Sequence, residues 1–109
     1  MSKEYYDPGM YGTDNYWKYP YGKLIYVDSV RNFCQEKKAY WILDLIASYR
    51  FEISFLVITI DVEDGTAMFK AKEDDGMPDV VAQFIEYTDL DVSVKFFLED
   101  GVLIFPSDH

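Results

Sequence analysis

Two paired strands are predicted by the stretch ISFLVITIDVEDGTAMFKAK, which occupies residues 53–72. Residues 53–62 are rich in β-branched side chains and are long enough to form a central strand. Asp64-Gly65 is a two-residue hairpin signal that leads into a second strand, residues 66–72. Along this second strand Ala67, Phe69 and Ala71 are expected on one face. The opposite face is expected to carry Thr66, Met68, Lys70 and Lys72.

Three more strands are expected downstream, at residues 80–88, 92–98 and 102–105. An acidic loop ending in Gly and Pro, residues 73–78, precedes the first of them, and Glu99-Asp100-Gly101 separates the last two. Successive hairpins without an intervening helix predict an antiparallel sheet. The last strand is expected at an edge, where a second copy of the chain can pair with it.

Two helices are expected upstream of the sheet, at residues 29–37 and 39–49. Asp28 and Ser29 are favourable residues at a helix start. The second helix is apolar almost all round, which is typical of a helix that covers a sheet face. Its one acid, Asp44, is expected either to point to solvent or to hold a buried partner such as a tyrosine hydroxyl.

The predicted fold class is therefore α+β, with two N-terminal helices packed on a roughly five-stranded antiparallel sheet. A length of 109 residues favours a single domain. Its expected parts are an irregular tyrosine-rich arm over residues 1–27, the helices over 28–50 and the sheet over 51–109.

Negative charge is concentrated in the second half of the chain. The net charge is −10, which makes nucleic acid and anionic membranes unlikely direct ligands because both carry negative charge. Residues 51–109 hold three Lys and fourteen Asp and Glu, whereas residues 1–50 are nearly neutral. These acids are either solvated faces or a surface for a basic partner protein. The candidate partner-binding acids are Asp61, Glu63, Asp64, Glu73, Asp74, Asp75 and Asp79.

Seven of the ten tyrosines lie in the first 26 residues, where Pro and Gly exclude a regular helix. Tyrosine offers a large contact area with few rotatable bonds. The segment is interpreted either as an arm packed over the protein's own core or as an aromatic patch for a partner. Tyr16, Trp17 and Tyr19 are its candidate contact residues.

Reactive side chains are scarce in this chain. Its one histidine, His109, is the last residue, which argues against a Ser-His-Asp or Cys-His site and against a zinc site. Its one cysteine, Cys34, lies on the apolar face of the first predicted helix and is expected to be a buried hydrophobic residue. Neither an intrachain disulfide nor a signal peptide is indicated, so a cytoplasmic protein is expected. Because reactive side chains are scarce, the protein is expected to be non-enzymatic and to hold no metal or cofactor.

Four segments resemble a family of small uncharacterised proteins found in bacteria, phages and mobile elements: residues 12–17, 24–30, 39–49 and 98–107. The family has no known activity, so the resemblance assigns no residue a role. Small acidic proteins of such origin often bind and block a host protein, as anti-CRISPR proteins do. The resemblance therefore implies an inhibitor of a host protein with a basic surface, in the host cytoplasm if the chain is phage-encoded.

Two other functions remain open from the sequence. One is a small-molecule-binding or enzymatic domain with a pocket where the aromatic arm meets the second helix. The residues expected to line it are Tyr16, Trp17, Tyr40, Trp41 and Asp44. The other is a homo-oligomeric structural protein, possible as a dimer through strand 102–105.

Overall fold

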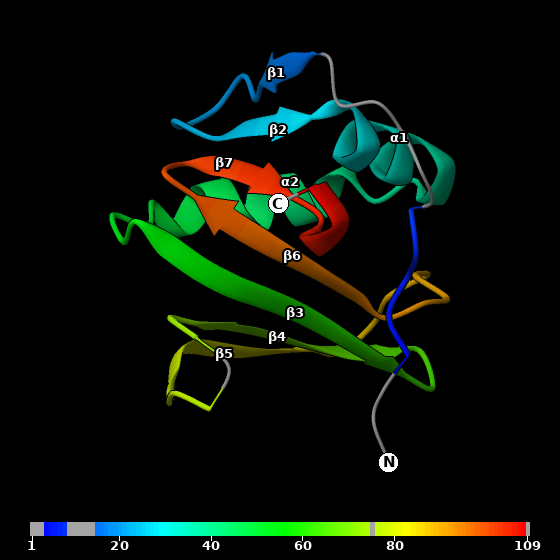
Figure 1. Ribbon diagram of the computed structural model, residues 1–109. Coiled ribbons are helices and arrows are strands. Elements are labelled where there is room, and N and C mark those ends of the chain that lie inside the picture. The colour runs from blue at the N-terminus through cyan, green and yellow to red at the C-terminus, as the bar shows by residue number, and fades with distance from the viewer. Residues whose placement is uncertain (1–3, 9–14, 75, 109) are drawn as a thin grey trace.

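The protein has two layers, a seven-stranded sheet and two helices against one of its faces (Figure 1). The computed structural model describes residues 4–8, 15–74 and 76–108. In chain order the elements are β1 (Tyr16–Lys18), β2 (Ile25–Val27), α1 (Asp28–Lys37), α2 (Tyr40–Tyr49), β3 (Phe55–Glu63), β4 (Thr66–Lys72), β5 (Asp79–Ile85), β6 (Val94–Glu99), β7 (Val102–Ile104) and a short 3₁₀ turn (Pro106–Asp108).

The strand order is β1-β2-β7-β6-β3-β4-β5. The α+β class is confirmed, but the sheet is larger than predicted and it is mixed. All pairs are antiparallel except β2 and β7, in which Ile25 lies opposite Val102 and Tyr26 opposite Leu103. The expectation of a roughly five-stranded antiparallel sheet was therefore wrong in both strand number and strand direction.

The two additional strands come from the segment expected to be an irregular arm over residues 1–27. The sequences Tyr-Trp-Lys of β1 and Ile-Tyr-Val of β2 consist mainly of good strand formers, but each strand has only three residues. So short a run gives no readable alternation, and its stability comes from pairing with a neighbour. β1 pairs with β2, and β2 pairs with β7, which lies far away in the sequence.

Strand 102–105 was expected at an edge of the sheet, and this expectation was also wrong. β7 lies between β2 and β6, so its backbone is paired on both sides. Beyond the end of β7, the N-terminal segment continues along β6. Tyr5 forms a parallel bridge with Ser93, and the Tyr6 amide donates to the Ser93 carbonyl at 2.8 Å.

The two helices follow the sequence prediction to within one residue at each end. α1 begins at Asp28, and no side chain caps its first turn. α1 and α2 are followed by Lys38 and Arg50, both in the left-handed conformation that commonly closes a helix. Lys37 lies in the last turn of α1, where a cation favours the negative end of the helix dipole.

The β3–β4 hairpin also agrees with the sequence. Asp64 and Gly65 both have positive φ, 49° and 78°, as a tight two-residue turn with primed geometry requires. Burial alternates along β4, with Ala67, Phe69 and Ala71 buried and the residues between them half-buried. β5 and β6 are shorter than predicted, because the chain between Glu86 and Ser93 forms a loop.

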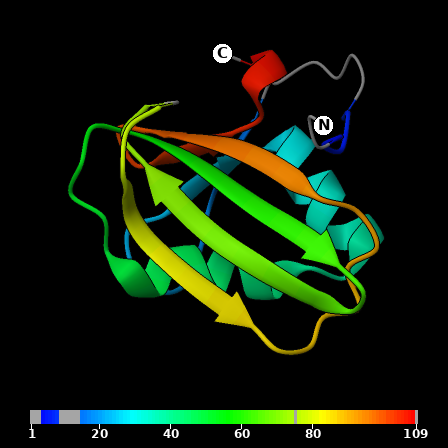
Figure 2. The ribbon, with the colours of Figure 1, turned by 90° about the horizontal axis from the view of Figure 1, so that it is seen from below.

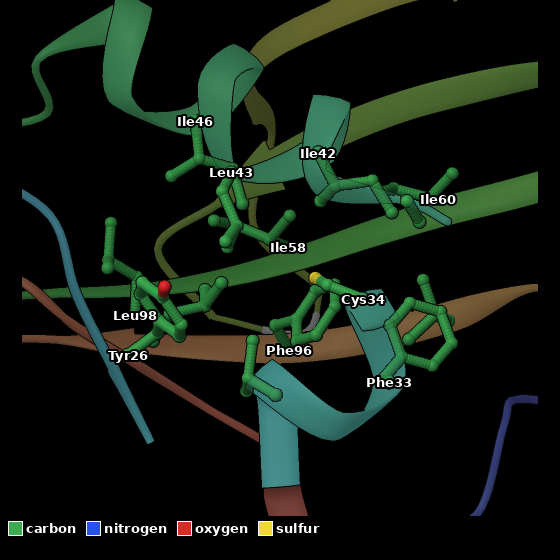
Figure 3. Packing of buried hydrophobic residues seen from close by; sticks show 14 of the residues in the cluster. Tyr26, Phe33, Cys34, Ile42, Leu43, Ile46, Ile58, Ile60, Phe96 and Leu98 are labelled. Carbon is green, nitrogen blue, oxygen red and sulfur yellow. The ribbon is translucent and has the colours of Figure 1, made fainter. Parts of the chain in front are cut away.

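The hydrophobic core lies between the helices and the sheet. Ile42, Leu43 and Ile46 of α2 point toward Ile58 and Ile60 of β3 (Figure 3). An aromatic group closes one end of this core, with Phe33 of α1 against the rings of Tyr6, Phe96 and Phe105. Within the described residues, neither helix is long and apolar enough to cross a bilayer.

Candidate functional site

The predicted acidic residues form two groups at opposite ends of β3 and β4. Glu63 and Asp64 lie at the β3–β4 hairpin, whereas Glu73 and Asp74 follow the other end of β4. A seven-residue strand separates the two ends by about 20 Å. The two groups thus lie on the same strands, but the sheet does not bring them together. Asp75 lies outside the described residues.

The remaining predicted acids occupy different surroundings. Asp61, near the end of β3, is half-buried and accepts a hydrogen bond from the Tyr5 hydroxyl at 3.1 Å. Asp79 is exposed at the first position of β5. Asp61 is therefore used in fixing the N-terminal segment, while Asp79 faces solvent at the border of the sheet.

The face of the sheet opposite the helices carries charges of both signs, since Asp61 and Glu99 share it with lysines. The three lysines of the second half of the chain all gather there, as cross-strand neighbours of Val57 and Thr59 on β3. They are Lys70, Lys72 and Lys95. Val57 and Thr59 are buried, consistent with cover by the aliphatic stems of these lysines. The excess negative charge therefore lies at the two ends of β3 and β4 and along β5, the strand at the border of the sheet.

Three acids that the sequence prediction missed join the hairpin end of the sheet. The Thr88 amide donates to the Gly65 carbonyl at 2.8 Å, which holds the loop after β5 against the β3–β4 turn. This loop carries Glu86, Asp89 and Asp91. A sequence signal for them exists, because no Lys or Arg occurs between Lys72 and Lys95.

We call residues 76–91 the β5 segment, since they contain the border strand and its flanks. Four of its side chains are large, apolar or aromatic, and exposed: Met77 at 50%, Val80 at 43%, Phe84 at 57% and Tyr87 at 75%. Its carboxylates are those of Asp79, Glu86, Asp89 and Asp91. Val80 and Phe84 lie on β5 itself, and Met77 and Tyr87 lie on its two flanks. Exposed apolar groups gathered along one segment make it a candidate interaction surface.

Two of these carboxylates have neighbours within the protein. The Tyr87 hydroxyl donates to Asp89 at 2.7 Å, and this hydrogen bond raises the pKa of Tyr87. Asp91 forms an exposed ion pair with Lys37 of α1 at 3.2 Å. An exposed pair of this kind contributes little to stability, so Asp91 can exchange Lys37 for another cation at small cost.

The aromatic candidates of the first segment are largely engaged by the protein itself. The Trp17 indole N–H donates to Asp28 at 2.6 Å, and the Arg31 guanidinium lies 3.9 Å from the centre of the Trp17 ring. The Tyr19 hydroxyl donates to Asp44 at 3.3 Å. Asp44 is thus exposed, as the first alternative for it stated, and its tyrosine partner lies at the surface rather than buried. Tyr16 is exposed on β1.

Replacing Trp17 by Phe should raise the pKa of Asp28. The indole hydrogen bond is the main cause that lowers this pKa below its ordinary value, and Asn15 adds two weaker hydrogen bonds. A lowered pKa stabilises the fold above the ordinary carboxyl pKa, and this stabilisation is lost as pH falls through the lowered value. Trp17→Phe should therefore make stability less dependent on pH in the acid range.

The measurement is an NMR titration of the Asp28 carboxyl carbon, combined with urea unfolding at neutral and acid pH. Tyr16→Phe is the matched control, because Tyr16 adjoins Trp17 on β1 and is not among the groups that shift the Asp28 pKa. An unchanged Asp28 pKa in Trp17→Phe would contradict the assignment.

Two hollows of the surface lie beside the predicted aromatic pocket and share only Asp44 with it. One, about 410 Å³, lies between the C-terminal end of α2 and the β6–β7 turn, and its charged lining is mixed: Lys23, Arg50, Glu52 and Asp100. A second one, about 270 Å³, adjoins it beside Asp44 and Tyr21. Neither is lined by Trp17, Tyr40 or Trp41. The contacts of Trp17 instead fill the junction between β1 and α1.

Cys34 is fully buried in the core, and its sulfur lies beside Phe96 (Figure 3). Burial raises the pKa of the Cys34 thiol to about 12, so the group stays protonated and unreactive at neutral pH. Within the described residues, no three His, Cys, Asp or Glu side chains are placed to hold a metal ion.

Together these features define a small two-layer α+β protein whose distinguishing surface is an acidic, apolar sheet border. Residues 8–109 match the profile of the family of unknown function DUF6876, and the chain belongs to this family. Comparison with curated proteins and with solved structures gave no match.

Proposed function

We propose that this chain is a non-catalytic binding protein that engages a basic surface of another protein through the β5 segment. The observation that carries the proposal is the composition of this segment, in which exposed apolar side chains lie among carboxylates without any Lys or Arg. Apolar contacts supply affinity, and the uniform charge selects a positively charged partner and speeds its approach.

The partner class we favour is a host protein that handles nucleic acid, in the setting of a phage or mobile element. Proteins of this class carry basic grooves for phosphates, and an acidic border that occupies such a groove competes with the nucleic acid. The chain thereby acts as an inhibitor in the host cytoplasm. A CRISPR-associated complex is one member of this partner class.

The double variant Asp79→Lys/Glu86→Lys tests the proposal, because both acids lie on the β5 segment and both are exposed. Each exposed ion pair contributes about 0.2–1 kcal/mol, and reversal turns two attractions into two repulsions of similar size, so affinity should fall at least about fourfold. The measurement is quantitative capture of bacterial lysate proteins on the immobilised chain at low and high salt, followed by mass spectrometry.

The matched control is Glu36→Lys/Glu52→Lys, which makes the same charge change on α1 and on the loop before β3. Proteins that bind through the β5 segment should be retained by the wild type and by this control, and lost from the β5 variant and at high salt. Added double-stranded DNA should release them. Capture that is indifferent to salt and to the β5 charges would contradict the proposal.

A further inference from the structure

The outer backbone edge of β5 has no strand beyond it in the described part of the chain. Figure 2 shows β3, β4 and β5 in front of both helices, with β5 as the outermost of these strands. An edge strand leaves a row of N–H and C=O groups available for pairing with another chain. The strand has seven residues, which is enough to pair with an incoming segment along its whole length.

β5 lacks most of the devices that protect natural sheet edges. Such edges are usually very short, or carry Lys or Pro, or are covered by a helix. The opposite edge, β1, follows this pattern, because it has three residues and includes Lys18. β5 contains neither Lys nor Pro, and its one irregularity is a register shift beside Lys72, opposite the start of the strand. From Val81 to Ile85 its pairing with β4 is regular.

The side chains of β5 determine which residues an incoming strand needs in its middle and at its ends. Gln83 lies on the helix side, where it accepts a hydrogen bond from the Tyr49 hydroxyl. Phe84 lies on the opposite face beside Met68 of β4, and 57% of it remains exposed. The middle of the strand therefore offers apolar contacts, while the carboxylates of Asp79 and Glu86 mark its two ends, about 20 Å apart.

This charge pattern decides between a second copy and a different partner. Antiparallel pairing of β5 with β5 of another copy would place Asp79 of each copy next to Glu86 of the other. Like charges in neighbouring cross-strand positions are destabilising. A segment with cations at its ends meets the carboxylates of Asp79 and Glu86 favourably instead, while Lys72 of β4 is the cross-strand neighbour of Asp79 on the inner side of β5.

We propose that β5 binds its partner by strand addition, taking up an extended segment with β-branched or apolar residues in the middle and Lys or Arg at both ends. This proposal rests on the proposed function and specifies how the partner is held. Main-chain hydrogen bonds to β5 supply affinity, the exposed Phe84 ring contacts the middle of the segment, and the end carboxylates select for charge.

The test uses the ¹⁵N-labelled full chain and synthetic peptides as probes. The first peptide is Lys-Lys-Val-Thr-Val-Thr-Val-Lys-Lys with blocked ends. In the second, two central residues are replaced by Pro, which removes N–H groups and prevents an extended ladder. In the third, every Lys is replaced by Glu. Binding is followed by NMR titration and by amide hydrogen exchange of residues 80–85.

Strand addition predicts that the first peptide binds and slows exchange of the outward-facing β5 amides at least about tenfold. The proline peptide should bind at least about tenfold more weakly, and the glutamate peptide should not bind. If both lysine-containing peptides bind equally and the β5 amides stay unprotected, strand addition is wrong and the acidic surface alone is responsible.

Three other outcomes are informative. If neither lysine-containing peptide binds, the proposed function at this border fails together with strand addition. Equal binding of the lysine and glutamate peptides would contradict the proposal that the partner is basic. Sedimentation of the chain alone tests whether a second copy binds at β5. A dimer in which the β5 amides are protected from exchange would show that the second copy, and not a basic segment of another protein, pairs with β5.

Discussion

Phe33→Ala is expected to lower the free energy of unfolding by about 3–5 kcal/mol, the usual cost of deleting a fully buried aromatic ring. Phe33 is completely buried in α1. Its ring lies 4.7 Å from that of Tyr6, 5.9 Å from Phe105 and 6.0 Å from Phe96, measured between centroids. One side chain thus joins α1, the N-terminal segment, β6 and the chain after β7.

The control for this variant is Phe84→Ala, the same chemical change at an exposed site on β5. It should cost under about 1 kcal/mol, since surface substitutions outside special features have small effects. Both are measured by urea unfolding followed by tyrosine and tryptophan fluorescence. Equal losses in the two variants would contradict the packing described around Phe33.

Cys34 is expected to react with a thiol reagent at least about a thousandfold more slowly in the folded protein than in urea. A pKa of about 12 leaves about a thousandfold less thiolate near pH 8 than an ordinary cysteine has. Full burial excludes the reagent in addition. Reaction in the folded state therefore requires local or global opening, and its rate reports that opening.

The matched control is Cys34→Ala/Gln35→Cys, which moves the thiol by one residue to an exposed position of the same helix. This variant should react at the rate of a free thiol in both states. Labelling is followed by absorbance or mass spectrometry. Fast reaction of Cys34 in the folded wild type would show that the core around α1 is open to the reagent.

Local sequence signals were sufficient to predict those helices and strands whose residue pattern lies within the element itself. The Asp64-Gly65 turn predicted the β3–β4 hairpin, and the alternation along β4 placed Ala67, Phe69 and Ala71 on one shared face, which is the buried one. The two helices followed from their apolar faces and end residues. In each case neighbouring residues determine the geometry, so the information lies within a few positions of the chain.

β1 and β2 were missed because their structure depends on a distant partner. Ile25-Tyr26-Val27 is too short to show a period, and the parallel pairing with β7 leaves no mark in the segment itself. The same omission led to the wrong placement of strand 102–105 at an edge. Once β2 occupies the outer side of β7, the sheet borders become β1 and β5.

The candidate surface was predictable in charge but not in shape. The sequence indicated an acidic second half and included Asp79, Asp64 and Asp74 among its candidate acids, but it did not show how the acids are arranged relative to one another. Their separation follows from the length of β4, while the approach of the loop at Glu86 to the hairpin follows from one backbone hydrogen bond, Thr88 to Gly65. Charge is a property of composition, whereas a surface requires tertiary contacts.

The parallel pairing of β2 with β7 has a consequence for the order in which the fold forms. β2 (Ile25–Val27) and β7 (Val102–Ile104) lie far apart in the sequence, so their pairing closes a long loop. The helices and the β3–β4 hairpin depend on contacts between nearby residues and can form first. Ile25 and Tyr26 therefore gain their neighbours Val102 and Leu103 late in folding.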